Sequence, residues 1–144
     1  LDRGAAALEQ DRAGMTRFLW DTWGPPGWFS AAEFAETARS FENPDWLAVV
    51  LHSYRSRWGL AAGDPAYAGL EARLNPAPVI AVPTLVLHGS ADAANDPSTS
   101  ANREGSFSAA YRRILLDGIG HFPSREAPEA VGQAITAFVR DPAR

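Results

Sequence analysis

Two residues in the second half of the chain, an aspartate and a histidine, are the ones best suited to chemistry. Asp92 lies four residues beyond His88, and His121 lies five residues beyond Leu116. A carboxylate beside an imidazole fixes the tautomer of the ring and stabilises the imidazolium that forms when the ring removes a proton, so such pairs drive acyl or alkyl transfer. The alternative is that His121 is an ordinary loop histidine whose ring is satisfied by backbone groups.

Two short strands are expected to position this pair. Residues 84–88 form a continuous apolar run that is typical of a strand buried on both faces, and residues 111–116 predict a second strand. The interval between them, with Asp96-Pro97 as a helix start, is long enough for a crossover helix, which favours parallel pairing. Functional groups of open parallel sheets lie in loops outside the carboxyl ends of the strands, and both candidates follow a strand there.

Two parallel strands do not make a stable sheet, even with a helix on one face. That helix is predicted by an apolar stripe of Ala130, Val131, Ala134, Ile135, Phe138 and Val139. One edge of a two-stranded sheet would still expose unpaired backbone groups, and its apolar side chains would meet water. We therefore expect a missing N-terminal core segment, or a partner chain, to complete the sheet.

The first half of the chain reads as helical. Residues 2–19 predict a first helix, and Ser30 with Glu33 is a capping-box signature for a second helix to about Phe41. Asp64-Pro65 predicts a further short helix through Leu74, before the proline-rich link at residues 75–78. The composition changes there, so we divide the chain into a helical lid segment, 1–76, and a β-containing segment, 77–144.

A helix that starts at Asn43-Pro44 and stops at Gly59 carries the third candidate residue, Tyr54. Leu47, Val50, Leu51, Tyr54 and Trp58 fall on one face of it at helical spacing. This stripe predicts that Tyr54 points inward.

Composition excludes several classes of function. The net charge of −4 is spread without runs of one sign, so we do not expect nucleic acid or a membrane surface as a partner. We expect a small uncharged substrate instead. All 13 basic residues are arginine, which removes lysine Schiff bases and the phosphate-binding loop lysine, and there is no cysteine. The three histidines show no short metal-ligand spacing, so we expect no metal and no cofactor. No signal peptide or membrane span is evident, and a cytoplasmic location is expected.

The motifs around the two loops carry a resemblance to a known family. Pro-Thr-Leu-Val-Leu-His-Gly-Ser-Ala-Asp at residues 83–92, Gly-Ile-Gly-His-Phe-Pro at 118–123 and Glu-Ala-Pro-Glu at 126–129 resemble the end of α/β-hydrolases. The chain order of that superfamily is nucleophile, acid, histidine, so the resemblance implies Asp92 as the acid and His121 as the general base. It also implies a partial α/β-hydrolase fold, in which a helical lid precedes the last two parallel strands and the C-terminal helix of the core.

The lid adds a second resemblance. The segment from Trp46 to Trp58 is similar to the lid helix of epoxide hydrolases, where a tyrosine just before an arginine reaches into the site, and Tyr54 matches that tyrosine. A phenol can donate to an epoxide oxygen as the C–O bond breaks. An ordinary core tyrosine is the alternative. All five tryptophans lie in this half and either line an apolar substrate cavity or fill the core of the lid.

The sequence thus predicts a hydrolase of epoxide-hydrolase type, with Asp92 and His121 activating the hydrolytic water and Tyr54 assisting ring opening. No nucleophile elbow occurs in the 144 residues, so the nucleophile is expected upstream and the chain alone should be inactive. The alternatives are a serine esterase, a haloalkane dehalogenase or a non-catalytic hydrolase-fold module. His88 is expected only to end a strand, and Glu126 only to favour the last helix through its dipole.

Overall fold

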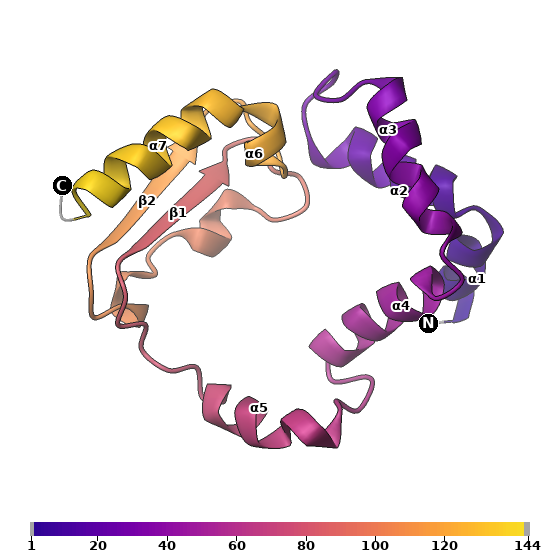
Figure 1. Ribbon diagram of the computed structural model, residues 1–144, viewed down its shortest axis with the longest axis horizontal. Helices are drawn as coiled ribbons and strands as arrows, with labels where there is room; N and C mark the ends of the chain where they lie inside the picture. The colour runs from indigo at the N-terminus through magenta and orange to yellow at the C-terminus, as the bar shows by residue number, and fades with distance from the viewer. Residues whose placement is uncertain (1, 143–144) are drawn as a thin grey trace. The chain divides into compact units, whose positions relative to one another are not determined.

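The structure, a computed structural model, describes residues 2–142 as seven α-helices, two β-strands and short 3-10 turns (Figure 1). The chain divides into two compact units. The first contains the residues up to Leu19 together with Phe29–Ala77, and the second contains Trp20–Trp28 and the residues from Pro78 onward. No helix within residues 2–142 combines the length and the apolar character that crossing a bilayer requires.

The helices of the first half are α1 (Asp2–Gln10), α2 (Arg12–Trp23), α3 (Ala31–Ala38), α4 (Trp46–Arg57) and α5 (Ala68–Leu74). The single helix predicted over residues 2–19 is wrong, because Asp11 interrupts it. The Asp11 carboxylate accepts a hydrogen bond from the backbone N–H of Gly14 at 2.7 Å. A side-chain oxygen that caps the first turn in this way starts a new helix, α2.

The side-chain caps predicted at Ser30 and Asp64 are confirmed, whereas the helix expected to start at Asn43-Pro44 begins at Trp46. The Ser30 hydroxyl accepts from the Glu33 N–H at 3.1 Å and starts α3, which a 3-10 turn at Arg39–Glu42 extends. Asp64 caps the turn Pro65–Tyr67 before α5 by accepting from the Ala66 N–H at 2.9 Å. Gly59 follows α4 with a φ of +68°, a conformation that glycine adopts without strain.

The inward orientation predicted for Tyr54 is wrong. Tyr54 is 53% exposed and Trp58 is 72% exposed, whereas the first half of the predicted stripe on α4 is half-buried. The buried contacts lie at the other end of the helix, where the Trp46 ring is 5.1 Å from the ring of the buried Phe41. The described part of the first unit does not cover the last turn of α4, so helical spacing alone did not decide which side chains are buried.

The second unit contains the predicted parallel pair of strands. β1 (Thr84–Gly89) pairs with β2 (Tyr111–Leu116), with Thr84 opposite Tyr111 and Gly89 opposite Leu116. The predicted α/β fold class is confirmed. The expected burial of residues 84–88 on both faces is not met within the described residues, since all five side chains stay partly exposed.

The crossover helix expected between the strands is absent from the described residues 90–110, which contain only the 3-10 turns Pro97–Ser100 and Glu104–Ser106. Asp96 caps the first of them as predicted, accepting from the Ser98 N–H at 2.8 Å. The turn cannot continue, because Ala101 is extended and Asn102 has a φ of +56°. An extended residue followed by a left-handed one ends any helix.

Helix α6 (Pro123–Glu126) is followed by α7 (Pro128–Arg140), which runs along the two strands (Figure 1). Phe138 of α7 is buried, and the Arg112 guanidinium of β2 lies 5.4 Å from the centre of its ring. Ile135 is 48% exposed and Val139 is 72% exposed. The apolar stripe of α7 is therefore wider than the face that the described residues cover.

Candidate active site

Asp92 and His121 come together at the carboxyl end of the parallel strands. The two loops leave the same edge of the sheet, because Gly89 ends β1 opposite Leu116, the end of β2. Nδ1 of His121 lies 3.0 Å from Oδ2 and 3.1 Å from Oδ1 of Asp92. The side chains are 26% and 7% exposed respectively. The predicted contact between the carboxylate and the imidazole is present.

The partners of the His121 ring decide its tautomer. Both atoms that face Nδ1 are carboxylate oxygens, which only accept hydrogen bonds, so Nδ1 carries the proton. Nε2 of the neutral ring then has its lone pair, and no hydrogen bond to it is present among residues 2–142. The partly exposed ring can accept a proton at Nε2, as a general base must.

Asp92 is held as a carboxylate. Burial by itself raises its pKa, but hydrogen bonds from the Asn95 N–H, the His121 ring and the Ala94 N–H, with the charge of His121, outweigh burial and lower the pKa below its ordinary value. Both backbone bonds reach Oδ1 at 2.9 Å. A carboxylate that is ionised at neutral pH stabilises the imidazolium that forms when His121 takes a proton.

The histidine loop can approach the end of β1 and the segment around Gly24 only because glycines stand at the points of contact. A Cβ on Gly89 would clash with the backbone of Ile119 and Gly120, and a Cβ on Gly120 would clash with Gly24. The Ala91 N–H donates to the Ile119 carbonyl at 2.8 Å across this contact. Glycine at these positions is therefore required by the close backbone approach.

Glu126 holds the histidine loop from both sides. Its Oε2 accepts from the Gly120 N–H at 2.5 Å, and its Oε1 accepts from the Phe122 N–H at 2.9 Å. These residues flank His121, so the carboxylate fixes the backbone that carries the ring. The sequence interpretation of Glu126 as a helix-dipole residue missed this role. The signal available in the sequence was the position of Glu126 five residues after His121, in a loop whose backbone N–H groups need acceptors.

Three of the five tryptophans belong to the second unit and pack around the histidine loop. Trp23 and Phe122 each lie edge-on to the His121 ring, at 5.1 Å between ring centres. Trp28 stacks on Phe122 at 4.6 Å, and the indole of Trp28 donates to the Trp20 carbonyl at 2.9 Å. The backbone joins this contact as well, because the His121 N–H donates to the Trp23 carbonyl at 2.9 Å. These aromatic rings form an apolar wall beside the imidazole.

The sequence interpretation also missed His88. Its Nε2 lies 3.3 Å from Oδ2 of Asp92, and its side chain is only 11% exposed. The residue thus does more than end a strand. The spacing of four residues between His88 and Asp92 gave no signal by itself, because the contact depends on how the loop turns back.

Tyr54, the third predicted site residue, belongs to the first unit. Its exposed phenol is not part of the core of that unit, so the alternative of an ordinary core tyrosine loses its support. Its catalytic role stays a prediction.

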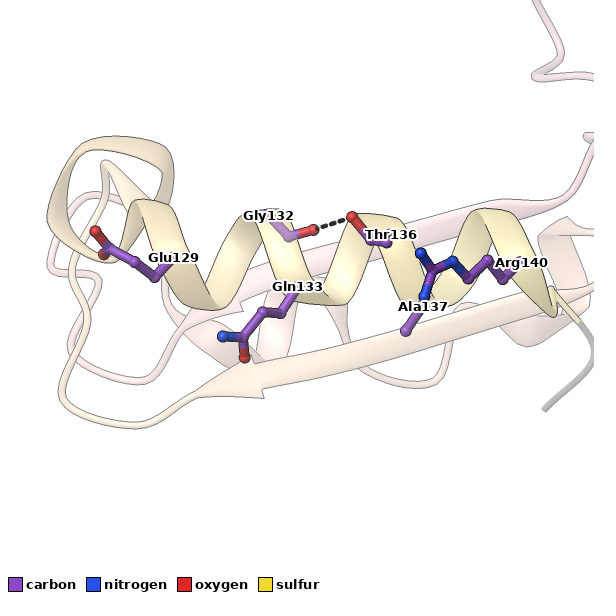
Figure 2. A pocket seen from close by; sticks show the side chains of 6 residues that line it. All are labelled: Glu129, Gly132, Gln133, Thr136, Ala137 and Arg140. Carbon is purple, nitrogen blue, oxygen red and sulfur yellow. Dashed lines mark hydrogen bonds between the residues drawn. The ribbon is translucent and has the colours of Figure 1, made fainter.

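The hollow of about 520 Å³ on the second unit does not include the pair. Figure 2 shows that its six lining residues, Glu129, Gly132, Gln133, Thr136, Ala137 and Arg140, all come from α7. A hollow along one helix does not enclose a small ligand in the way that binding sites do. No group of three or more potential metal-ligating His, Cys, Asp or Glu side chains occurs within the described part of the chain.

Comparison with known proteins adds one structure. A crystal structure from Klebsiella pneumoniae subsp. pneumoniae, named a "putative epoxide hydrolase", matches with a TM-score of 0.89 and 38% sequence identity over 97% of this chain. This chain spans 46% of the length of that protein. The chain is thus similar to about half of it. The match supports an epoxide-hydrolase-like relationship. No protein-family model and no curated protein matches the chain.

Proposed function

We propose that this chain carries the water-activating half of a lidded α/β-hydrolase of epoxide-hydrolase type. The observation that carries the proposal is the orientation of His121, whose Nδ1 is held by the Asp92 carboxylate at 3.0 Å while Nε2 keeps its lone pair. The similarity to the "putative epoxide hydrolase" supports the same activity. In this proposal the nucleophile is an aspartate on polypeptide outside these 144 residues.

The proposed reaction has two steps. The nucleophilic carboxylate attacks an epoxide carbon, the C–O bond breaks, and the ring oxygen takes a proton from Tyr54, which leaves a hydroxyalkyl ester and a phenolate. His121 Nε2 then takes a proton from water as the water oxygen attacks the ester carbonyl. Collapse of the tetrahedral intermediate releases a diol and the carboxylate, and the proton on His121 returns to the phenolate through solvent.

The surroundings of His121 support an uncharged, largely apolar substrate. Trp23 and Phe122 contact the ring edge-on, and the Glu126 carboxylate is already engaged by two backbone N–H groups. An apolar wall with few unengaged charges excludes water from reactive intermediates and binds neutral molecules.

Exposed apolar side chains on the sheet support further polypeptide as a partner of this chain. Leu85, Val86 and Leu87 stay partly exposed in β1, and Leu115 of β2 is 46% exposed. Burying such side chains contributes about 25 cal/mol per Å² of apolar surface, so a complete sheet would be much more stable. We propose that a core segment supplies the missing strands and the nucleophile together.

A trapping experiment on the full natural protein tests the proposal. His121→Gln should lower diol formation by about 10²- to 10⁴-fold, the usual contribution of a general base, while ester formation continues. Mass spectrometry should then detect the protein with one substrate mass added, on an aspartate. His52→Gln, a change at an exposed histidine of the first unit, is the matched control and should turn over normally.

The outcomes separate the candidates. An adduct on a serine, formed from an aryl ester and not from an epoxide, would make the protein an esterase with the same acid and base. Undiminished diol formation by His121→Gln would refute the proposal altogether.

A further inference from the structure

We infer that His88 is a positioning residue for Asp92 and His121. Its ring is held in a single tautomer by the acceptors that face Nε2, and the Ser100 hydroxyl binds Nδ1. The effect of His88 on turnover rests on the proposed function above. The tautomer and the contacts do not, since they follow from the hydrogen bonds of the second unit alone.

A chain of contacts runs from β2 through the crossover segment to the end of β1. Nε of Arg113 donates to the Ser100 hydroxyl oxygen at 2.8 Å, and Nη2 of Arg113 donates to the Pro97 carbonyl at 2.7 Å. The same hydroxyl lies 2.7 Å from Nδ1 of His88. The guanidinium thus fixes Ser100, and Ser100 fixes one side of the His88 ring.

The other side of the ring decides where the proton is. Nε2 of His88 lies 3.0 Å from the Asn95 carbonyl oxygen and 3.3 Å from Oδ2 of Asp92. Both atoms only accept, so Nε2 carries the proton. In the neutral ring Nδ1 then accepts the hydrogen of Ser100, in place of the longer contact of that hydroxyl with the Pro97 carbonyl at 3.2 Å, which keeps its bond from Arg113. A neutral ring with its proton on Nε2 satisfies every partner at once.

This tautomer closes the turn that presents Asp92. The Asn95 N–H donates to Oδ1 of Asp92, while the Asn95 carbonyl accepts from His88. The ring therefore holds the far end of the turn and points its N–H edge toward Oδ2, the oxygen nearest to His121. At 11% exposure the ring is shielded from water, and electrostatic contacts are stronger in such surroundings. Without the contact to His88 the Asp92 carboxylate could rotate, and its Oδ2 would then no longer point at Nδ1 of His121.

Nitrogen NMR on the full natural protein tests the tautomer without any substrate. Long-range ¹H–¹⁵N correlation distinguishes a protonated from an unprotonated ring nitrogen, and His88 should have its proton on Nε2. Ser100→Ala should leave the proton on Nε2, because the acceptors at that nitrogen remain, but it should remove the hydrogen bond at Nδ1 of His88 and shift the Nδ1–H resonance of His121. Ser98→Ala, the same change at an exposed residue of the same turn, should leave that resonance unchanged.

A pair of amide substitutions tests the positioning. The amide nitrogen of His88→Gln can occupy the place of Nε2, whereas the amide of His88→Asn reaches only the place of Nδ1. We expect kcat for epoxide hydrolysis to stay within about threefold in His88→Gln and to fall about ten- to thirtyfold in His88→Asn, with KM unchanged in both, as for loss of one contact to a charged group.

Several results would overturn the inference: a proton on Nδ1 of His88, an unshifted His121 resonance in Ser100→Ala, or equal kcat in the Gln and Asn variants. If His88→Asn fails to fold, Ser100→Ala provides the decisive measurement. A failure of the proposed function looks different, because His121→Gln would then keep full turnover while the His88 tautomer stayed as inferred.

Discussion

The substitution Glu126→Gln measures how much the two hydrogen bonds from the histidine loop to Glu126 contribute to the stability of the site. The carboxylate accepts from two backbone N–H groups, those of Gly120 and Phe122. A glutamine of the same length has one carbonyl oxygen, so one N–H keeps its partner and the other meets an NH₂ group. The substitution therefore removes one charge-assisted hydrogen bond and leaves one partly buried donor unsatisfied.

The magnitude follows from these two losses. A hydrogen bond to a charged group contributes about 1.5–3 kcal/mol, and an unsatisfied buried donor costs about 1–3 kcal/mol. Glu126 is only half-buried, so we take the lower part of this range, about 2 kcal/mol. That value corresponds to a roughly thirtyfold increase in opening of the loop, since 1.4 kcal/mol is a factor of ten.

Amide hydrogen exchange is the direct assay, because it reports on the two N–H groups themselves. In Glu126→Gln, the amide of either Gly120 or Phe122 should exchange about thirtyfold faster, and kcat should fall because His121 lies between them. Glu129→Gln is the matched control, since Glu129 is an exposed residue of the next helix and should change stability by less than about 0.5 kcal/mol. If the amides of Gly120 and Phe122 exchange at the same rates in Glu126→Gln and Glu129→Gln, the hydrogen bonds to Glu126 do not stabilise the loop.

Three further predictions concern other parts of the site. The pKa of Asp92 is lowered in the folded state, so the ionised carboxylate stabilises the fold above the ordinary aspartate pKa. This contribution is lost as pH falls through the lowered pKa. The difference in unfolding free energy between wild type and Asp92→Asn should therefore shrink on acidification below about pH 4. Gly89→Ala should lower the unfolding free energy by more than about 2 kcal/mol, measured by chemical denaturation, since its Cβ would clash with the Ile119 backbone. Tyr54→Phe should leave stability within about 0.5 kcal/mol, because the phenol is exposed, yet slow epoxide opening far more than aryl ester cleavage; equal slowing would remove its proposed role.

The strands and the pair of catalytic candidates could be predicted from the sequence because their signals are local. Thr84–Gly89 and Tyr111–Leu116 are short apolar runs with turn residues on both sides, and each precedes one candidate by a few residues. Parallel strands place their carboxyl ends at one edge, so topology alone brings Asp92 near His121. The caps at Ser30 and Asp64 were also predictable, since a cap depends on residues within one turn.

The features that could not be predicted depend on contacts between distant segments. The 3-10 crossover ends because Asn102 adopts a left-handed conformation, which residue type permits but does not require. Trp20–Trp28 belongs with the second unit, where the Trp23 carbonyl accepts from the His121 N–H, although the sequence analysis placed it in the lid segment, 1–76. His88 and Glu126 act through loops whose course no periodicity describes.

The geometry of Asp92 and His121 does not depend on their own hydrogen bond alone, and this affects what Asp92→Asn would measure. The Asn95 and Ala94 N–H groups would still hold the amide oxygen of the substituted side chain, and the Trp23 carbonyl and Glu126 would still hold the histidine loop. The amide oxygen, in the place of Oδ1, would stay about 3.1 Å from Nδ1 of His121, while the new NH₂ group, in the place of Oδ2, would lie 3.0 Å from it. The NH₂ group opposes a proton on Nδ1, so the tautomer with the proton on Nε2, which has no lone pair there for a proton from water, would gain population. A neutral amide also no longer stabilises the imidazolium, so Asp92→Asn would lower general-base catalysis in a loop that stays in place.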